Sequence, residues 1–106
     1  MAVATAREIL LNYKEALAQA DKLDELAAEL ENIGVTNLND ALIDIRNSWQ
    51  GDNADAFLRK AQPLTSKNQA IVKKIRNAAS AIRTIATNVY NAEMRALELA
   101  AVRTYH

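Results

Sequence analysis

Cysteine is absent from this sequence of 106 residues, which also holds only one His, one Pro and two Gly. The absence of Cys excludes disulfides, thiolate metal sites and Cys nucleophiles. The single His is residue 106, and the sequence has no Glu-x-x-His motif of the kind that binds di-iron centres in helical bundles. It has no Gly-rich phosphate-binding loop either. We therefore expect no enzymatic activity, no metal and no cofactor.

Long apolar runs are absent as well. No stretch approaches the roughly 18 apolar residues that a membrane-spanning helix requires. The N-terminal segment MAVATAREILLNYKEA lacks the basic region followed by an apolar run that defines a secretory signal peptide. We therefore expect a protein that is made in the cytoplasm, has no stable membrane insertion, and is exported, if at all, through a different signal.

The residues that are present favour helices. Half of them are hydrophobic and a quarter are charged, and the few turn formers leave room for only a few long elements. We predict one all-α domain over residues 1–106. Its net charge is zero, but the two halves of the chain carry opposite charge. Residues 1–48 hold nine acidic and four basic residues, a net charge of −5, and residues 49–106 hold four acidic and nine basic residues, a net charge of +5. Attraction between these halves would favour a chain that folds back on itself.

The first half has the pattern of one long helical arm, over about residues 5–48. Thr5 and Glu8 have the spacing of a capping box, in which the Thr hydroxyl accepts from the Glu amide. Apolar residues then recur at alternating steps of four and three, which is a heptad seam. The seam residues are Ile9, Tyr13, Ala16, Ala20, Leu23, Ala27 and Leu30, and Leu10, Leu17, Leu26 and Ile33 widen the stripe.

The seam of the first arm slips by one residue within NIGVTN, residues 32–37. The later apolar residues each come one position late; they are Val35, Leu38, Leu42, Ile45 and Trp49. Gly34 suits the residue after a helix C-terminus, and Thr36 or Asn37 can begin a new helix. We therefore predict two helices, over about 5–33 and 37–48. A continuous helix with a local bulge is the alternative.

The second half predicts another long arm, over about residues 53–104, after a link at 49–52. Asp52 or Asn53 can cap it. Its predicted seam is Phe57, Ala61, Leu64, Asn68, Ile71, Ile75, Ala78, Ile82, Ile85, Val89, Ala92, Ala96 and Leu99. Asn68 is the one polar member. Pro63 lies inside this arm and removes a backbone hydrogen bond, so we expect a kink there in preference to a break with a restart at Ser66.

Two arms of similar length joined by a short link predict an antiparallel helical hairpin. One hairpin alone would expose a long apolar stripe, so we expect two hairpins to dimerise into a four-helix bundle. The seam residues would pack both between the two arms of a hairpin and between the two hairpins of the dimer. Lys60, Lys67 and Lys74 recur every seven residues, near Lys73, Arg76 and Arg83. These residues would form a basic stripe that either binds nucleic acid or, as we expect, faces the acidic arm or water. A purely structural coiled-coil adaptor is the other alternative.

The link between the arms carries a recognisable motif. Trp49, Gln50 and Gly51 are followed by Ala56 and Phe57, a small residue and an aromatic that open the second arm. Together with the chain length, the two heptad arms and the central position, this motif resembles the Trp-X-Gly family of small type VII (Esx-type) secretion proteins. That family includes proteins like the early secreted antigenic target of mycobacteria, with relatives across Gram-positive bacteria. We expect the Trp49 ring to pack near Phe57, and Gly51 to permit the chain reversal.

The resemblance implies a dimer of hairpins that is secreted in the folded state without a cleaved signal peptide. Family members act as effectors or as carriers, so the implied partners are a similar chain in a homodimer or heterodimer, the secretion ATPase, and a larger toxin cargo. Members also carry a Tyr-x-x-x-Asp/Glu export signal on the second helix, which works with the partner's Trp-X-Gly loop. Here Glu93 lies three residues after Tyr90 and four after Val89. The resemblance makes these three residues the candidate C-terminal export signal; the alternative is that Tyr90 flanks the seam and Glu93 is solvated.

Overall fold

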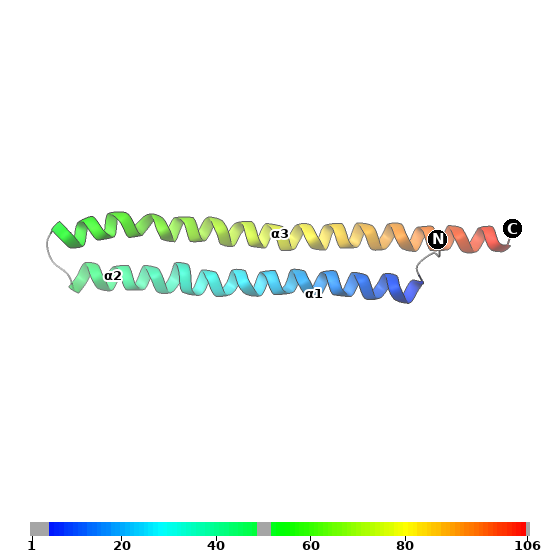
Figure 1. Cartoon of the computed structure of the whole chain (residues 1–106), viewed down its shortest axis with the longest axis horizontal. Helices are drawn as coiled ribbons and strands as arrows, with labels where there is room; N and C mark the ends of the chain where they lie inside the picture. The colour runs from blue at the N-terminus through cyan, green and yellow to red at the C-terminus, as the bar shows by residue number, and fades with distance from the viewer. Residues whose placement is uncertain (1–4, 49–51, 106) are drawn as a thin grey trace. The chain divides into compact units, whose positions relative to one another are not determined.

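The computed structural model describes the backbone of residues 5–48 and 52–105 and the side chains of residues 5–48 and 54–102. All of the described backbone after Thr5 is helical. The helices are α1 (Ala6–Glu31), the π-helix η1 (Asn32–Asn37), α2 (Leu38–Ser48) and α3 (Asp52–Tyr105), as drawn in Figure 1. The predicted all-α fold is confirmed.

The chain divides into two compact units, and the division falls inside α1 and α3. Unit 1 comprises Met1–Lys22 and Ala78–His106, and unit 2 comprises Leu23–Asn77. In unit 1, Tyr13 contacts Tyr90 while the later residue Asp21 contacts the earlier residue Arg83. Contacting residues that run in opposite order along the chain mean that the two helical segments are antiparallel.

Unit 2 has the same antiparallel arrangement. Glu31 pairs with Arg76, the carbonyl of Gly34 accepts from Asn68, and Leu42 belongs to a cluster with Leu58. Residue numbers again rise on one side as they fall on the other. α2 and the first part of α3 therefore run in opposite directions on either side of residues 49–51 (Figure 1). The predicted helical hairpin is confirmed.

The start of α1 follows the predicted capping box. The backbone amide of Glu8 donates to Oγ1 of Thr5 over 3.2 Å, and the amide of Ile9 donates to the Thr5 carbonyl over 3.0 Å. The Thr5 hydroxyl thus satisfies one of the amides that a helix N-terminus leaves without an internal partner.

Residues of the apolar seam form the surface of the first arm that packs against α3. Its buried residues are Ile9, Ala20, Ala27 and Leu42, and its half-buried residues are Tyr13, Ala16, Leu23, Leu30, Val35, Leu38 and Ile45. Ala20 and Ala27 are completely inaccessible, as is Ala79 on α3. A methyl side chain at these positions lets the two backbones of each unit approach closely.

The predicted break in the first arm is wrong, because the helix continues through residues 32–37 as the π-helix η1. A π-turn closes over five residues instead of four and so accommodates one additional residue without ending the helix. This returns Val35, Leu38, Leu42 and Ile45 to the face that packs on α3. Gly34 is therefore not a C-terminal cap, and the alternative of a continuous helix with a local bulge is correct.

Helix α3 continues through Pro63, so the break and the restart at Ser66 are excluded. Proline inside a helix costs about 3 kcal/mol relative to alanine, because it has no amide hydrogen and its ring clashes with the preceding turn. Part of that cost is offset by the stiffness that proline gives the unfolded chain, about 0.4–1 kcal/mol.

Replacing Pro63 by Ala is therefore expected to stabilise the protein by about 2–2.6 kcal/mol. Urea denaturation followed by circular dichroism measures this change in the free energy of unfolding. Gln62→Ala, at the neighbouring exposed position, is the control and should change stability by less than about 0.5 kcal/mol. A loss of stability in Pro63→Ala would mean that unit 2 depends on the proline.

The predicted seam of α3 is divided between two faces. Ala61, Asn68, Ile75 and Ile82 are buried or half-buried against the first arm. Phe57, Leu64, Ile71, Ile85 and Val89 are exposed instead. The positions that complete the packed face are Ala54, Leu58, Thr65, Val72 and Ala79, which the sequence analysis did not include. Ala54, Leu58 and Ala61 begin a second series of alternating four and three steps that overlaps the predicted one.

Candidate functional site

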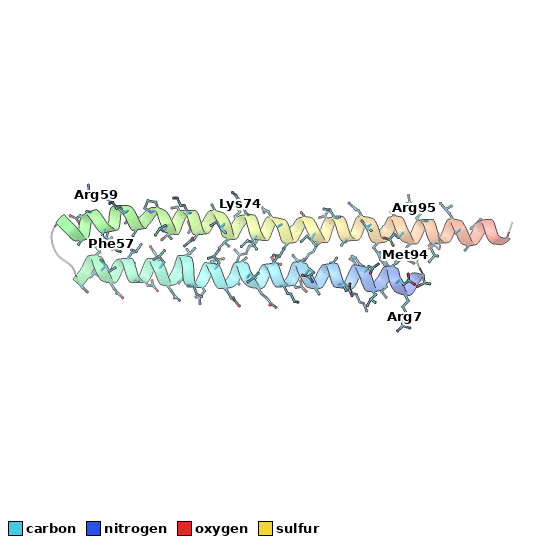
Figure 2. All side chains as sticks on the ribbon, viewed as in Figure 1. Arg7, Phe57, Arg59, Lys74, Met94 and Arg95 are labelled. Atoms are coloured by element: carbon cyan, nitrogen blue, oxygen red, sulfur yellow. The ribbon has the colours of Figure 1, made fainter. Side chains whose placement is uncertain are left out.

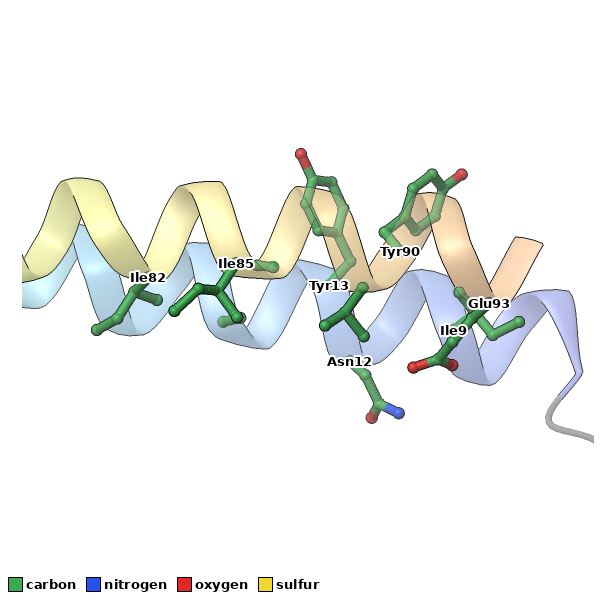
Figure 3. A pocket seen from close by; sticks show the side chains of 10 residues that line it. Ile9, Asn12, Tyr13, Ile82, Ile85, Tyr90 and Glu93 are labelled. Atoms are coloured by element: carbon green, nitrogen blue, oxygen red, sulfur yellow. The ribbon is translucent and has the colours of Figure 1, made fainter. Parts of the chain in front are cut away.

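An open cavity of about 280 Å³ lies in unit 1, between α1 and α3. Figure 3 shows it from close by. Its walls are almost entirely apolar. Asn12 contributes an amide group and Glu93 contributes a carboxylate. The lining residues are Ile9, Asn12, Tyr13, Ala16, Ile82, Ile85, Ala86, Val89, Tyr90 and Glu93. Six of the predicted seam residues and all three residues of the candidate C-terminal signal are among them.

Two tyrosines form one wall of this cavity. The rings of Tyr13 on α1 and Tyr90 on α3 lie side by side (Figure 3), with centroids 4.8 Å apart and planes inclined by 31°. Offset aromatic pairs of this kind are worth about 0.5–1.5 kcal/mol beyond the area they bury. The Tyr13 hydroxyl also lies 3.2 Å from Oγ1 of Thr87, within hydrogen-bond distance. Tyr90 is therefore held in place by α1.

The structure brings Val89, Tyr90 and Glu93 together around the cavity, as their helical spacing predicts. Val89 is about half exposed (48%), whereas Tyr90 and Glu93 are half-buried. Tyr90 flanks the packed face, and the Glu93 side chain lies at the cavity. The Tyr13 stack and the Thr87 contact were missed, because the residues lie more than 70 positions apart in the sequence.

Both units expose large apolar side chains. In unit 1 they are Leu10, Leu11, Ile85, Val89, Leu99 and Val102, and in unit 2 they are Leu26, Ile33, Ile43, Phe57, Leu64 and Ile71. Along α3 one set of exposed residues recurs at a strict interval of seven, at 57, 64, 71, 78, 85, 92 and 99, and all members of this set are apolar. We call this set the outer heptad row. Apolar residues that repeat at one heptad position and stay exposed are typical of a helix that packs against a further helix.

The basic stripe of α3 is partly neutralised by the acidic first arm. Arg76 lies 2.5 Å from the Glu31 carboxylate in unit 2, and Arg83 lies 2.8 Å from Oδ1 of Asp21 in unit 1. The lysines at 60, 67, 73 and 74 are exposed, and Lys74 points away from the first arm in Figure 2. The stripe is thus divided between contact with the acidic arm and exposure to solvent.

The Trp-X-Gly motif lies outside the described residues, so the expected packing of the Trp49 ring near Phe57 and the role of Gly51 stay predictions. Phe57 itself is described and is 44% exposed at the start of α3. Within residues 5–48 and 52–105, no helix is long and apolar enough to cross a membrane. Among the same residues no group of three or more His, Cys, Asp or Glu side chains is arranged to hold a metal ion.

Comparisons of this chain with protein-family models, with curated proteins and with solved structures found no match.

Proposed function

We propose that this chain is a small protein of a type VII (Esx-type) secretion system, exported as an effector or as the carrier of a partner protein. The observation that carries the proposal is the position of the Trp-X-Gly motif. Residues 49–51 join α2 and α3, two helices that run antiparallel in unit 2. This is the place that the family resemblance assigns to the motif.

The grouping of Val89, Tyr90 and Glu93 at one cavity gives the proposal a second support. The family signal has an aromatic and an acidic residue one helical turn apart. In this chain the spacing differs from the family pattern, but the side chains still line one cavity. A receptor that docks on this wall of unit 1 would contact an apolar side chain, a tyrosine and a carboxylate together.

The exposed apolar residues support the dimeric state within this proposal. The outer heptad row on α3 is an apolar surface that antiparallel pairing inside one chain leaves uncovered. A second hairpin, either the same chain or a similar one, would cover it and complete a four-helix bundle. The secretion ATPase would then recognise the folded dimer, and a larger toxin would be the cargo if the protein is a carrier.

The test of this proposal is export from a bacterium that has a type VII secretion system. Cells expressing the unaltered chain are expected to accumulate it in the culture medium, whereas Trp49→Ala and Glu93→Ala are each expected to remain in the cell pellet. Quantitative blotting of the two fractions measures the exported share. Deletion of the secretion ATPase should retain all variants in the cell.

The matched control is Glu98→Ala, which removes an acidic residue from an exposed position on the same helix. Its export is expected to equal that of the unaltered chain. Circular dichroism of the purified variants checks that each is folded. Export of folded Trp49→Ala and Glu93→Ala at the level of the unaltered chain would rule out both residues as a signal, and retention of the unaltered chain would argue for the structural adaptor.

A further inference from the structure

The one-residue slip in the first arm can in principle be absorbed in more than one way. The heptad steps hold up to Leu30 and resume at Val35. The additional residue must lie between these two positions for Leu42 and Ile45 to face α3. The spacing of the apolar residues does not distinguish a helix that ends and restarts there from a continuous helix with a π-turn. The structure places the additional residue in η1, at Asn32–Asn37.

One backbone carbonyl in η1 has an unusual partner. The amide of Leu38 donates to the carbonyls of Ile33 and Val35, and so bypasses the carbonyl of Gly34. In an α-helix the Gly34 carbonyl would accept from that amide, four residues later. Here Nδ2 of Asn68, on α3, donates to the Gly34 carbonyl over 2.8 Å. A side chain from the opposite helix thus donates to the carbonyl that the Leu38 amide bypasses.

Gly34 is required for this approach because a side chain would occupy the same space. A Cβ atom at residue 34 would lie 2.9 Å from Nδ2 and 3.3 Å from Cγ of Asn68, and 3.0 Å from Cδ1 of Leu30. The first of these distances is shorter than Cβ atoms tolerate. The amide of Asn68 is at the end of a flexible side chain, so it would move away and lose the hydrogen bond.

Asn68 is also the exception within its own heptad position on α3. The residues at 61, 75 and 82 are apolar and pack on the first arm, as Asn68 does. A polar side chain in an apolar seam stabilises only the arrangement in which it finds a partner, and it disfavours the others. The carbonyl of Gly34 is such a partner.

We infer that Asn68 is a positioning residue that fixes the π-turn at residues 32–37 and thereby the packing phase of α2 against α3. The hydrogen bond to Gly34 favours the π-turn over the helix end and restart that the same spacing allows. The inference concerns unit 2 alone and does not depend on the proposed function.

A double-mutant cycle on the full chain tests the inference through a reversal of sign. In the Asn68→Ala background, Gly34→Ala is expected to raise the folding equilibrium constant by about two- to fivefold, because alanine is the better helix former. In the unaltered background it is expected to lower that constant by about two- to tenfold, because it breaks the bond to Asn68. Urea denaturation at one protein concentration measures all four proteins. Asn77→Ala, an exposed Asn of the same helix, is the control and should leave the effect of Gly34→Ala unchanged in sign.

Amide hydrogen exchange separates positioning from a general loss of stability. In Asn68→Ala the amides of residues 33–38 are expected to exchange about tenfold faster, relative to the amide of Ala27, because a local interaction that holds the turn is lost. Equal acceleration at Ala27 and at residues 33–38 would overturn the inference. So would an effect of Gly34→Ala that agrees between the two Asn68 backgrounds within about twofold, the usual error of additivity.

Discussion

Ile85→Asp is expected to convert the proposed dimer into a monomer at micromolar concentration. Ile85 is the most exposed large apolar residue of α3, at 61%, and belongs to the outer heptad row. Burial of an isoleucine in a dimer contributes about 1.5–3 kcal/mol, and burial of an unpaired carboxylate adds a further cost. A symmetric dimer would incur this loss twice, so we expect the dissociation constant to rise on the order of 100-fold or more. Sedimentation equilibrium measures this constant.

Asn88→Asp provides the matched control for Ile85→Asp. Asn88 is an exposed polar residue on the same helix, so the substitution adds the same negative charge away from the outer heptad row. Its dissociation constant should remain within about threefold of that of the unaltered chain. A monomeric unaltered chain at 100-fold higher concentration, on the order of 100 µM, would contradict the proposed dimer. A dimer that tolerates Ile85→Asp would place the interface on another face.

Leu42→Ala is expected to lower the free energy of unfolding by about 2–4 kcal/mol. Leu42 is 5% exposed and forms the core of unit 2 with Leu58 and Ala61, while Leu38 and Ile45 pack around them. Truncation removes the transfer free energy of the side chain and leaves a cavity between helices that cannot fully close. The effect is large, because small domains have total stabilities of only about 5–15 kcal/mol.

Ile43→Ala is the control for Leu42→Ala at the adjacent position. Ile43 is 38% exposed, and its removal should cost less than about 1.5 kcal/mol, since much of the side chain is already in contact with water. Thermal and urea denaturation at one protein concentration compare the two variants. Equal losses would mean that α2 does not present Leu42 to α3, which would contradict the packing phase that η1 produces.

The resolution of the phase slip illustrates where sequence reasoning stops. A helix end followed by a new start and a π-turn both displace the apolar seam by one residue, so the spacing of Leu30, Val35 and Leu38 fits either. Gly34 favoured the helix end, because glycine is common there. Its actual role is to leave space for Asn68, a residue 34 positions later, and no local pattern contains that information.

The two faces of α3 illustrate the same limit. The helix has apolar residues at several heptad positions. Periodicity predicts that they are buried, but it does not say whether they pack on the first arm or on another chain. The interval of seven from Phe57 to Leu99 is as regular as the series that begins at Ala54. Small side chains decide between them, because Ala54, Ala61 and Ala79 permit the close approach of the first arm.

The candidate C-terminal signal was predicted in part. Helical spacing alone places Val89, Tyr90 and Glu93 on neighbouring faces of one helix. The stack of Tyr90 on Tyr13 depends on the antiparallel register, which sets α1 beside α3 in unit 1, and so does the contact of the Tyr13 hydroxyl with Thr87.

The sequence by itself determined the helical class, the two arms, the capping box at Thr5, the packed face of the first arm and the position of the slip. All of these follow from the intervals between neighbouring residues, which a helix converts directly into faces. Only the tertiary structure decided that the slip is a π-turn, that α3 divides its apolar residues between two faces, and that Tyr13, Tyr90 and Glu93 share one cavity. Each of these depends on which residues from distant parts of the chain meet, and the contact between helices, not the period of either one, sets that choice.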